Sequence, residues 1–312
     1  MRRSLALLLV AALAACGGSS TEGSTSTSTT PTTTTSTTVP ETTTTSTTTT
    51  TTLPSTTTTA ASPPSTVAGS WAPQPLVVAN WGALGWWSES GWVSSFDTLP
   101  ISGGEDYQVV SVSGSGIVAG GPEVEVCEPI MNLGVELSDP SQLGEWPGPF
   151  GVAVSAPWVV QPNLVEQFTD DGTYAGHARD VLEGQGMDVA SPVIKQLYRV
   201  DLEGDGVNEV LVMAENFTSP GSEANPGDYS IVFIRRVVDV EVQTAILASS
   251  LHPSGGEVPF SHAVGGVGDL NGDGKMEIVV SSRYYEGASV HVFEWVDDDL
   301  GPLEQLSQGC GA

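Results

Sequence analysis

Short apolar runs separated by Gly, Pro and Ser follow one another along the chain from residue 76 onward. Brief runs rich in β-branched and aromatic side chains, bounded by turn-forming residues, are typical of β-strands. In the first half of the folded region these runs are Leu76–Asn80, Trp86–Val93, Tyr107–Val112 and Glu123–Val126. The pattern therefore predicts a β-rich region.

The second half repeats one order of runs around two acidic segments. Apolar runs lead into the segments at residues 196–200 and 263–267. After the first segment come Glu209–Ala214, Tyr229–Arg236 and Glu241–Ser249; after the second come Glu277–Ser282, Ser289–Val296 and Leu303–Ser307. We therefore expect two four-stranded antiparallel units, each similar to one blade of a propeller.

One stretch, residues 173–183, has the periodicity of a helix instead. Its apolar side chains recur at i, i+4, i+7 and i+8, and they are Tyr174, Ala178, Val181 and Leu182. Gly184 or Gly186 is expected to end the helix. One amphipathic helix beside antiparallel, blade-like sheets predicts a mainly β (α+β) fold.

The two acidic segments share one pattern, in residues 201–209 and residues 269–277. Each has side-chain oxygens at positions 1, 3, 5 and 9 and a glycine at position 6. Calcium takes about six to eight oxygen ligands and tolerates irregular geometry, so a tight loop of this kind suits it. Acids this close together repel one another unless a cation neutralises them. The spacing thus indicates two Ca²⁺ loops.

A plain Asp-Gly hairpin turn is the alternative interpretation of each loop. A turn alone requires only the Asp-Gly pair, and not the further oxygens at positions 1, 3 and 9. An EF-hand is disfavoured because its bidentate Glu belongs at position 12, where this chain has Val212 and Val280.

On these residues the chain resembles the FG-GAP and VCBS-type repeats of extracellular bacterial proteins and integrin-like β-propellers. Their loops have the form Asp-x-Asn-x-Asp-Gly-x-x-Asp/Glu between two strands. The likeness covers roughly residues 192–215 and 262–283. The Phe-Gly and Gly-Ala-Pro signatures are absent from these two stretches, which favours the VCBS-like side. Two repeats are too few to close a propeller by themselves.

The resemblance implies two structural Ca²⁺ ions and a set of ligands for each. The side-chain ligands would be Asp201, Glu203, Asp205 and Glu209 in the first loop, and Asp269, Asn271, Asp273 and Glu277 in the second. The backbone carbonyls of Val207 and Lys275 would complete the sites. Glu203 departs from the usual Asp or Asn at position 3.

The N-terminus has the organisation of a secretory signal peptide, residues 1–15. Arg2 and Arg3 precede a short apolar stretch, and Leu-Ala-Ala-Cys16 follows at once. This ending resembles the lipobox of bacterial lipoproteins, which implies cleavage before Cys16 and a lipid on its sulfur. An ordinary signal peptide with an incidental cysteine is the alternative. We expect a lipid anchor at the extracytoplasmic face of the cell membrane.

Residues 16–70 carry the lipidated Cys and are otherwise almost entirely Ser, Thr, Pro and Gly, a composition that cannot form a core. We interpret them as a disordered linker. About fifty such residues span roughly 40 Å as a coil and about 150 Å when extended. The linker would hold the folded part away from the membrane.

The folded part is expected to divide into a Trp-rich β region, residues 71–165, and the helix with the two repeats, residues 166–312. The whole chain has 37 acidic against 9 basic residues, a formal net charge of −28. This balance argues against nucleic-acid binding, which requires basic surface, and against electrostatic docking on anionic lipid.

Two cysteines are left once Cys16 carries lipid. Cys127 and Cys310 would face an oxidising exterior, where a disulfide is the expected state of such a pair. Two separate buried thiols are the alternative.

Five of the eight tryptophans fall close together, and they are Trp71, Trp81, Trp86, Trp87 and Trp92. Buried, these rings form the core of the first hairpins. Exposed on one face, they would stack on sugar rings, as in carbohydrate-binding modules. Both interpretations stay open on the sequence.

Catalysis finds little support in the sequence. The histidines, His177, His252, His262 and His291, show no metal-catalyst spacing, and Gly-x-Ser-x-Gly is absent. His177 and His262 are interpreted as residues that serve the fold. We therefore expect a lipid-anchored surface protein with non-enzymatic binding or adhesion, whose ligand is a cell-surface protein or a polysaccharide. A cell-wall carbohydrate module using the Trp-rich half is the alternative, and a secreted hydrolase is the third.

Overall fold

The computed structural model describes residues 74–161, 164–217, 221–238, 241–297 and 301–311, which belong to one unit of the chain, residues 62–312. The signal peptide, Cys16, the linker and Trp71 lie outside the described residues. No helix within the described ranges is long and apolar enough to cross a membrane.

The first sheet is built from the Trp-rich region and has seven strands in the order β3-β2-β1-β7-β4-β5-β6, all paired antiparallel. The strands are β1 (Leu76–Ala79), β2 (Gly82–Ser88), β3 (Gly91–Val93), β4 (Asp106–Ser111), β5 (Gly114–Val126), β6 (Asn132–Leu137) and β7 (Val152–Val154). A short 3-10 helix, η1 (Pro140–Leu143), precedes β7.

The two repeats form the other two sheets. A five-stranded sheet has the order β12-β11-β10-β9-β8, and a four-stranded sheet has the order β13-β14-β15-β16. Their strands are β8 (Val165–Glu166), β9 (Ile194–Val200), β10 (Glu209–Asn216), β11 (Asp228–Val238), β12 (Glu241–His252), β13 (Ser261–Gly268), β14 (Glu277–Tyr284), β15 (Gly287–Asp297) and β16 (Gly301–Gly311).

The expected mainly β fold with antiparallel sheets and one α-helix is confirmed in the described residues. The second repeat is four-stranded, as predicted. The first repeat gains a fifth strand, because β8 pairs with β9 through Val165–Arg199 and Glu166–Tyr198. Both residues of β8 are exposed. A strand of two exposed residues has no hydrophobic alternation from which it could be predicted.

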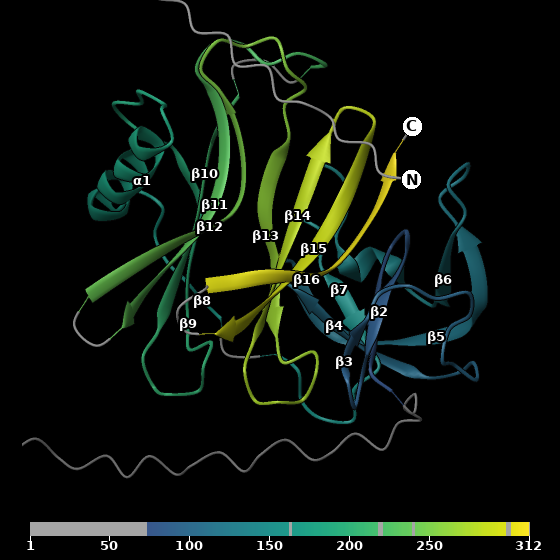
Figure 1. Ribbon diagram of the computed structural model, residues 1–312. Helices are drawn as coiled ribbons and strands as arrows, with labels where there is room; N and C mark the ends of the chain where they lie inside the picture. Colours follow the sequence, from purple (N-terminus) through teal and green to yellow (C-terminus); the bar gives the residue numbers. More distant parts are fainter. Residues whose placement is uncertain (1–73, 162–163, 218–220, 239–240, 298–300, 312) are drawn as a thin grey trace, which may run out of the picture. The chain divides into compact units, whose positions relative to one another are not determined.

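The three sheets pack face to face, with the four-stranded sheet in the middle (Figure 1). One apolar cluster joins it to the seven-stranded sheet and contains Val77, Val110, Val152, Val279, Val290 and Val292. A second cluster joins its other face to the five-stranded sheet and contains Leu211, Val232, Ile234, Val264, Val280 and Phe293. Neighbouring blades of a propeller pack in the same manner.

The outer faces of the stack are covered by other parts of the chain. The helix α1 (Gly172–Gly184) packs Ala178 and Leu182 on the outer face of the five-stranded sheet. Leu99 and Leu143 cover the outer face of the seven-stranded sheet. Both faces of each end sheet therefore contribute apolar residues to a buried cluster.

The predicted helix over residues 173–183 is therefore present, and it extends one residue further at each end. The side chain of Asp171 caps its start by accepting a hydrogen bond from the amide of Thr173 at 2.8 Å. Gly186 follows the last turn with φ of +85°, a conformation that favours glycine.

The strand β13 lies close to the seven-stranded sheet because glycines replace side chains there. A Cβ atom at Gly265 would collide with the carbonyl oxygen of Phe150, and one at Gly266 with that of Val110. Backbone groups at the free edge of β13 are hydrogen-bonded by a neighbouring sheet. The side-chain amide of Gln196 on β9 donates to the carbonyl of Val264 at 3.0 Å and accepts from its N–H at 2.8 Å. These contacts protect the edge from pairing with another chain.

The tryptophans of the first hairpins are mostly packing residues. Trp81 is 9% exposed and lies edge-on to Phe150 with ring centroids 4.9 Å apart. Trp86 packs on the apolar cluster at the outer face of the seven-stranded sheet, and Trp92 packs on the cluster between this sheet and the four-stranded sheet. Trp87 lies edge-on to Trp92 at 5.1 Å. In the described part of the cluster, the rings contribute to the core.

Cys127 and Cys310 form a disulfide in the structure, with Cα atoms 5.6 Å apart. The bond joins the end of β5 to β16 and thus links the seven-stranded sheet to the last strand of the four-stranded sheet.

Candidate metal centres

The two acidic segments are the loops of corresponding hairpins in the two repeats. The first connects β9 to β10 and the second connects β13 to β14. In each, the residue before position 1 pairs with the Glu of position 9: Val200 with Glu209, and Gly268 with Glu277. The structure therefore gives the two segments one common register, which the sequence spacing predicted.

The backbone of the two loops is also the same at the glycine positions. Gly204 and Gly206 have φ of +72° and +87°, and Gly272 and Gly274 have φ of +83° and +87°. Side chains rarely adopt this left-handed conformation, so glycine at position 6 is a geometric requirement of the turn.

The aspartates at positions 1 and 5 bind the loop backbone. In the first loop Asp201 accepts from the amides of Asp205 and Gly206, at 3.1 and 2.9 Å. In the second loop Asp269 accepts from Gly272 and Gly274, at 2.6 and 3.2 Å. These hydrogen bonds hold both carboxylates against the backbone of their own loops.

The glutamate at position 9 is buried in both loops. Glu277 is fully buried, and its Oε2 accepts from the amide of Leu270 at 2.6 Å. Burial, followed by the charges of Asp273, Glu294 and Asp269, raises the pKa of Glu277 to about 9. Glu209 is 3% exposed and accepts from Leu202 at 2.9 Å. Burial also raises the pKa of Glu209.

One oxygen of the second loop has its bonding capacity unfilled. Oε1 of Glu277 is buried and has no hydrogen-bond partner among the described residues. A buried carboxyl oxygen without a partner is unfavourable, and a cation beside it would stabilise the ionised form of this acid. The oxygen-only donor set of Asp269, Asn271 and Asp273 matches the preference of Ca²⁺. The residues present therefore match this ion in the chemical type of their donor atoms.

Position 3 differs between the loops in a systematic way. Oε1 of Glu203 lies 2.9 Å from Nη1 of Arg236 on β11. In the second loop, the side-chain nitrogen Nδ2 of Asn271 donates to Oε1 of Glu294 on β15 at 3.1 Å. Arg236 and Glu294 occupy corresponding positions of the third strand in each repeat. In both loops the side chain at position 3 thus contacts the same position of the third strand. In the first loop the side chain at position 3 accepts from a cationic Arg, and in the second loop it donates to a Glu.

Two tryptophans contact the second loop or its neighbour Glu294, although no sequence motif associates them with this site. Trp158 donates its indole N–H to the carbonyl of Asp269 at 2.8 Å, and its ring lies against Gly272. Trp92 donates to Oε2 of Glu294 at 2.9 Å. They come from the seven-stranded sheet and its following loop, so only the tertiary packing brings them to the site.

The two loops also contact one another. The amide of Met276 donates to the carbonyl of Leu202 at 2.8 Å. Gly204 lies beside the carbonyl of Gly274. The acidic side chains of both loops are therefore gathered at one edge of the stacked sheets.

The remaining predicted ligands are placed without a decisive contact. Val207 and Lys275 donate their amides to Asp205 and Asp273, at 2.7 and 2.8 Å. Metal ligation by their carbonyls stays a prediction. Within the described residues, no group of three or more His, Cys, Asp or Glu is arranged closely enough to hold a metal ion.

Three of the four histidines lie within hydrogen-bond distance of a serine. His262 is 8% exposed, its Nδ1 lies 2.8 Å from Oγ of Ser282, and burial lowers its pKa to about 4. Nε2 of His252 lies 2.7 Å from Oγ of Ser250. His177 lies beside Tyr174 on α1, and partial burial lowers its pKa.

One histidine has two polar partners in the order of a hydrolytic triad. Nε2 of His291 lies 2.8 Å from Oγ of Ser289, and its Nδ1 lies 2.9 Å from Oε2 of Glu304. The three residues stand on β15 and β16, where the backbone amides are engaged in the sheet ladder. The four histidines are scattered along the sequence, and their spacing gives no indication of this arrangement.

Comparison with protein families finds an FG-GAP repeat at residues 263–293. The match begins in β13, contains the second acidic loop and ends in β15. It supports the FG-GAP side of the resemblance and does not show a VCBS repeat. Neither the search of curated proteins nor the search of solved structures gives a match. An FG-GAP repeat indicates a β-propeller-like adhesion or binding module.

Proposed function

We propose that this chain is a lipid-anchored cell-surface protein that binds its ligand without catalysis and is stabilised by two Ca²⁺ ions. The observation that carries the proposal is the pair of loops with one register, one backbone conformation and one buried glutamate each. The FG-GAP repeat over the second loop supports a binding or adhesion role.

The residues that would hold each ion are those at positions 1, 3, 5 and 9. In the second loop they are Asp269, Asn271, Asp273 and Glu277, and in the first they are Asp201, Glu203, Asp205 and Glu209. The bound ion would neutralise the carboxylates that the fold draws together. The loops themselves keep Asp201 and Asp269 oriented through backbone amides.

Calcium acts in this proposal through linkage, because it binds the folded loops and not the unfolded chain. At millimolar external calcium and a Kd of about 10⁻⁴ M, each site adds roughly 1.4 kcal/mol to the free energy of unfolding. The stalk predicted from residues 16–70 would present the stabilised sheets away from the membrane.

Thermal melting of the full chain with calcium and with a chelator tests the calcium part. We expect a higher Tm in calcium, and a smaller calcium effect in Asp205→Ala and in Asp273→Ala. An equal Tm of the wild type under both conditions would leave ordinary hairpin turns as the explanation of the loops.

Membrane fractionation of cells that produce the full chain tests the anchor. The wild type is expected in the membrane fraction, sensitive to external protease, and Cys16→Ser in the medium or the soluble fraction. Equal membrane association of both forms would refute lipidation at Cys16.

A second candidate function is hydrolysis, favoured by the Ser289–His291–Glu304 arrangement. A base oriented by an acid and hydrogen-bonded to a hydroxyl is the arrangement that activates a serine. Hydrolysis of p-nitrophenyl acetate by the wild type, abolished in Ser289→Ala, would establish it. Equal rates of the two proteins would exclude this serine as a nucleophile.

A further inference from the structure

Two adjoining hollows open on the stacked sheets, away from the acidic loops. The first has a volume of about 530 Å³ and is lined by residues including Trp146, Glu215, Phe217, Arg283, Tyr284 and Tyr285. The second has a volume of about 600 Å³ and is lined by residues including Trp81, Glu128, Phe150 and Glu286. Trp146 and Tyr285 line both hollows, so they form a shared wall.

The shared wall presents aromatic surface to solvent. Trp146 is 59% exposed and Tyr285 is 52% exposed. Tyr285 also lies edge-on to Tyr284, with ring centroids 5.9 Å apart. Exposed aromatic rings at a concave site are typical of ligand binding, since each ring offers a large apolar face with little conformational entropy to lose.

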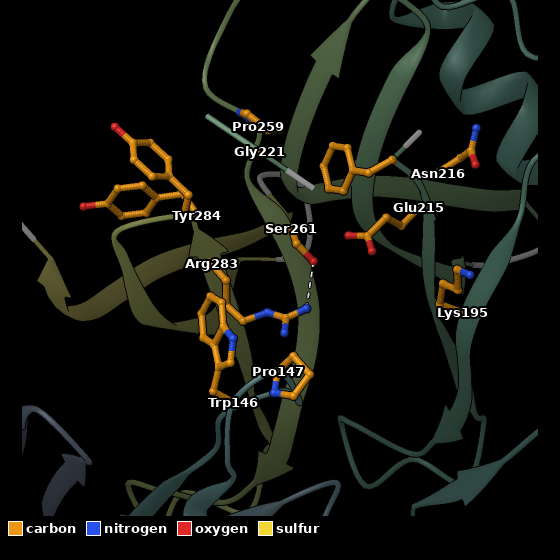
Figure 2. Close-up of a pocket in the computed structure, with 12 residues that line it drawn as sticks. Trp146, Pro147, Lys195, Glu215, Asn216, Gly221, Pro259, Ser261, Arg283 and Tyr284 are labelled. Carbon is orange, nitrogen blue, oxygen red and sulfur yellow. Dashed lines mark hydrogen bonds between the residues drawn. The ribbon is translucent and has the colours of Figure 1, made fainter. Parts of the chain in front are cut away.

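Polar groups with unused bonding capacity accompany the rings. Nη2 of Arg283 donates to Oγ of Ser261 at 3.0 Å, and its guanidinium lies 5.4 Å from the centre of the Trp146 ring. Figure 2 shows Arg283 beside Trp146, with the carboxylate of Glu215 across the cavity. Nε of Arg283 and Oε2 of Glu215 have no hydrogen-bond partner in the described part of the chain.

A hydroxyl group matches this pair because it both donates and accepts. One hydroxyl would donate to Glu215, and a neighbouring hydroxyl would accept from Arg283. Rotation of the carboxylate about its last bond turns either oxygen of Glu215 toward the cavity. Hydrogen bonds to the Glu215 carboxylate and the Arg283 guanidinium would favour ligands that carry hydroxyl groups.

The charge of the two hollows argues against an anionic ligand. The first hollow contains Arg283 and Lys195 beside Glu215, and the second contains Glu128 and Glu286, so the two hollows together have three acidic and two basic residues. The whole chain also has a formal net charge of −28. A polyanion would meet repulsion on approach and in the second hollow.

We propose that the two hollows form a binding groove for a neutral oligosaccharide. The apolar C–H face of a sugar ring stacks on Trp146 or Tyr285, and its hydroxyls bond to Glu215 and Arg283. A chain of several sugar units extends across the shared wall from one hollow into the other. This site includes Trp81 of the hairpin tryptophans, which is 9% exposed, but its exposed aromatic wall is formed by Trp146 and Tyr285. The inference rests on the proposed binding function and names its ligand class.

Titration calorimetry of the full chain in calcium tests the groove. The probes are hexamers and dimers of glucose, N-acetylglucosamine, xylose and mannose, together with a galacturonate hexamer as the anionic comparison. We expect at least one neutral hexamer to bind, more tightly than its dimer because it fills both hollows. The galacturonate hexamer is expected not to bind.

Variants locate the binding. Trp146→Ala and Tyr285→Ala should each weaken binding of that hexamer about tenfold, which corresponds to the loss of one aromatic stacking contact. Glu215→Gln should also weaken it. Phe168→Ala removes an aromatic ring that is 86% exposed and lines neither hollow, so it should bind within about twofold of the wild type, a change near the size of ordinary surface effects.

Three outcomes overturn the inference: no neutral hexamer binds, only the galacturonate hexamer binds, or neither aromatic variant weakens binding. A melting curve of each variant shows whether lost binding reflects lost folding. Calcium-dependent melting and surface anchoring are measured on the same wild-type protein. Their presence without saccharide binding would refute the groove and leave the proposed calcium-stabilised surface protein intact.

Discussion

Replacing Glu277 by Gln is expected to have opposite effects with and without calcium. Gln keeps the size of the side chain and cannot ionise. In the metal-free protein the wild-type carboxyl group is fully buried, with Oε1 lacking a partner among the described residues and with a pKa raised to about 9, so folding near neutral pH requires this acid to take up a proton. Removing a buried, unpaired acid should stabilise the metal-free fold by about 1–3 kcal/mol.

In calcium the same change removes a charged ligand from the second site. The variant then loses most of the contribution of that site, about 1.4 kcal/mol under the conditions given above. For a folded region of this size, 1 kcal/mol corresponds to a Tm change of about 2–4 °C. Glu277→Gln should therefore melt above the wild type in chelator, and its Tm should rise less on adding calcium.

Differential scanning calorimetry in both conditions checks this prediction, with Glu89→Gln as the control. Glu89 is exposed in the turn between β2 and β3, so its replacement should leave both melting temperatures unchanged. A variant that melts below the wild type by the same amount in chelator and in calcium would refute the reasoning. Glu277 would then be a structural acid with no part in metal binding.

Three further predictions concern the loops and the stacked sheets. Calorimetric titration should resolve two calcium affinities. The first loop should be the weaker site and should be removed by Asp201→Ala, because Arg236 is paired with Glu203 in that loop. One common affinity would contradict this expectation. Folding lowers the pKa of His262 from 6.5 to about 4. Between these pH values the unfolded chain is protonated at this histidine and the folded chain is not, so the free energy of unfolding falls as the pH drops from 6.5 toward 4. This loss, at most roughly 3 kcal/mol, should be absent from urea unfolding of His262→Phe. Gly265→Ala should lower the Tm in chelator and in calcium alike, since its Cβ meets the Phe150 carbonyl; an unchanged Tm would show that the sheets can separate.

The sequence was sufficient for features that depend on neighbours along the chain. Hydrophobic alternation gave the hairpins around both loops, and a helical stripe gave α1 nearly to the residue. The loop register followed from the acidic spacing, because positions 1 to 9 fix one turn geometry. These elements are local, so their residues carry the information.

Features that depend on packing between sheets could not be predicted in the same way. Trp158 over the second loop, and the exchange of polarity between Arg236 and Glu294 at position 3, join residues distant along the chain. The groove around Trp146 and Arg283 likewise draws on three sheets and their loops. Nothing in the local pattern of these residues distinguishes them from ordinary surface positions.

The histidine arrangement on β15 and β16 illustrates the same limit. Ser289 and His291 alternate on one face of a strand, which the period of two implies. Their partner Glu304 depends on the register of β16 against β15, which places Ser307 opposite His291. The sequence predicted both strands but not this register, because a bulge interrupts the pairing beyond Val292.

The proposed calcium sites are tested most directly by the number of calcium ions that the folded protein holds. Equilibrium dialysis of the full chain against millimolar calcium, followed by metal analysis, measures this number. We expect two ions per chain in the wild type and one in each of Asp205→Ala and Asp273→Ala. A wild-type protein that holds none would refute the calcium sites, and both loops would then be hairpin turns whose acids are held only by the backbone.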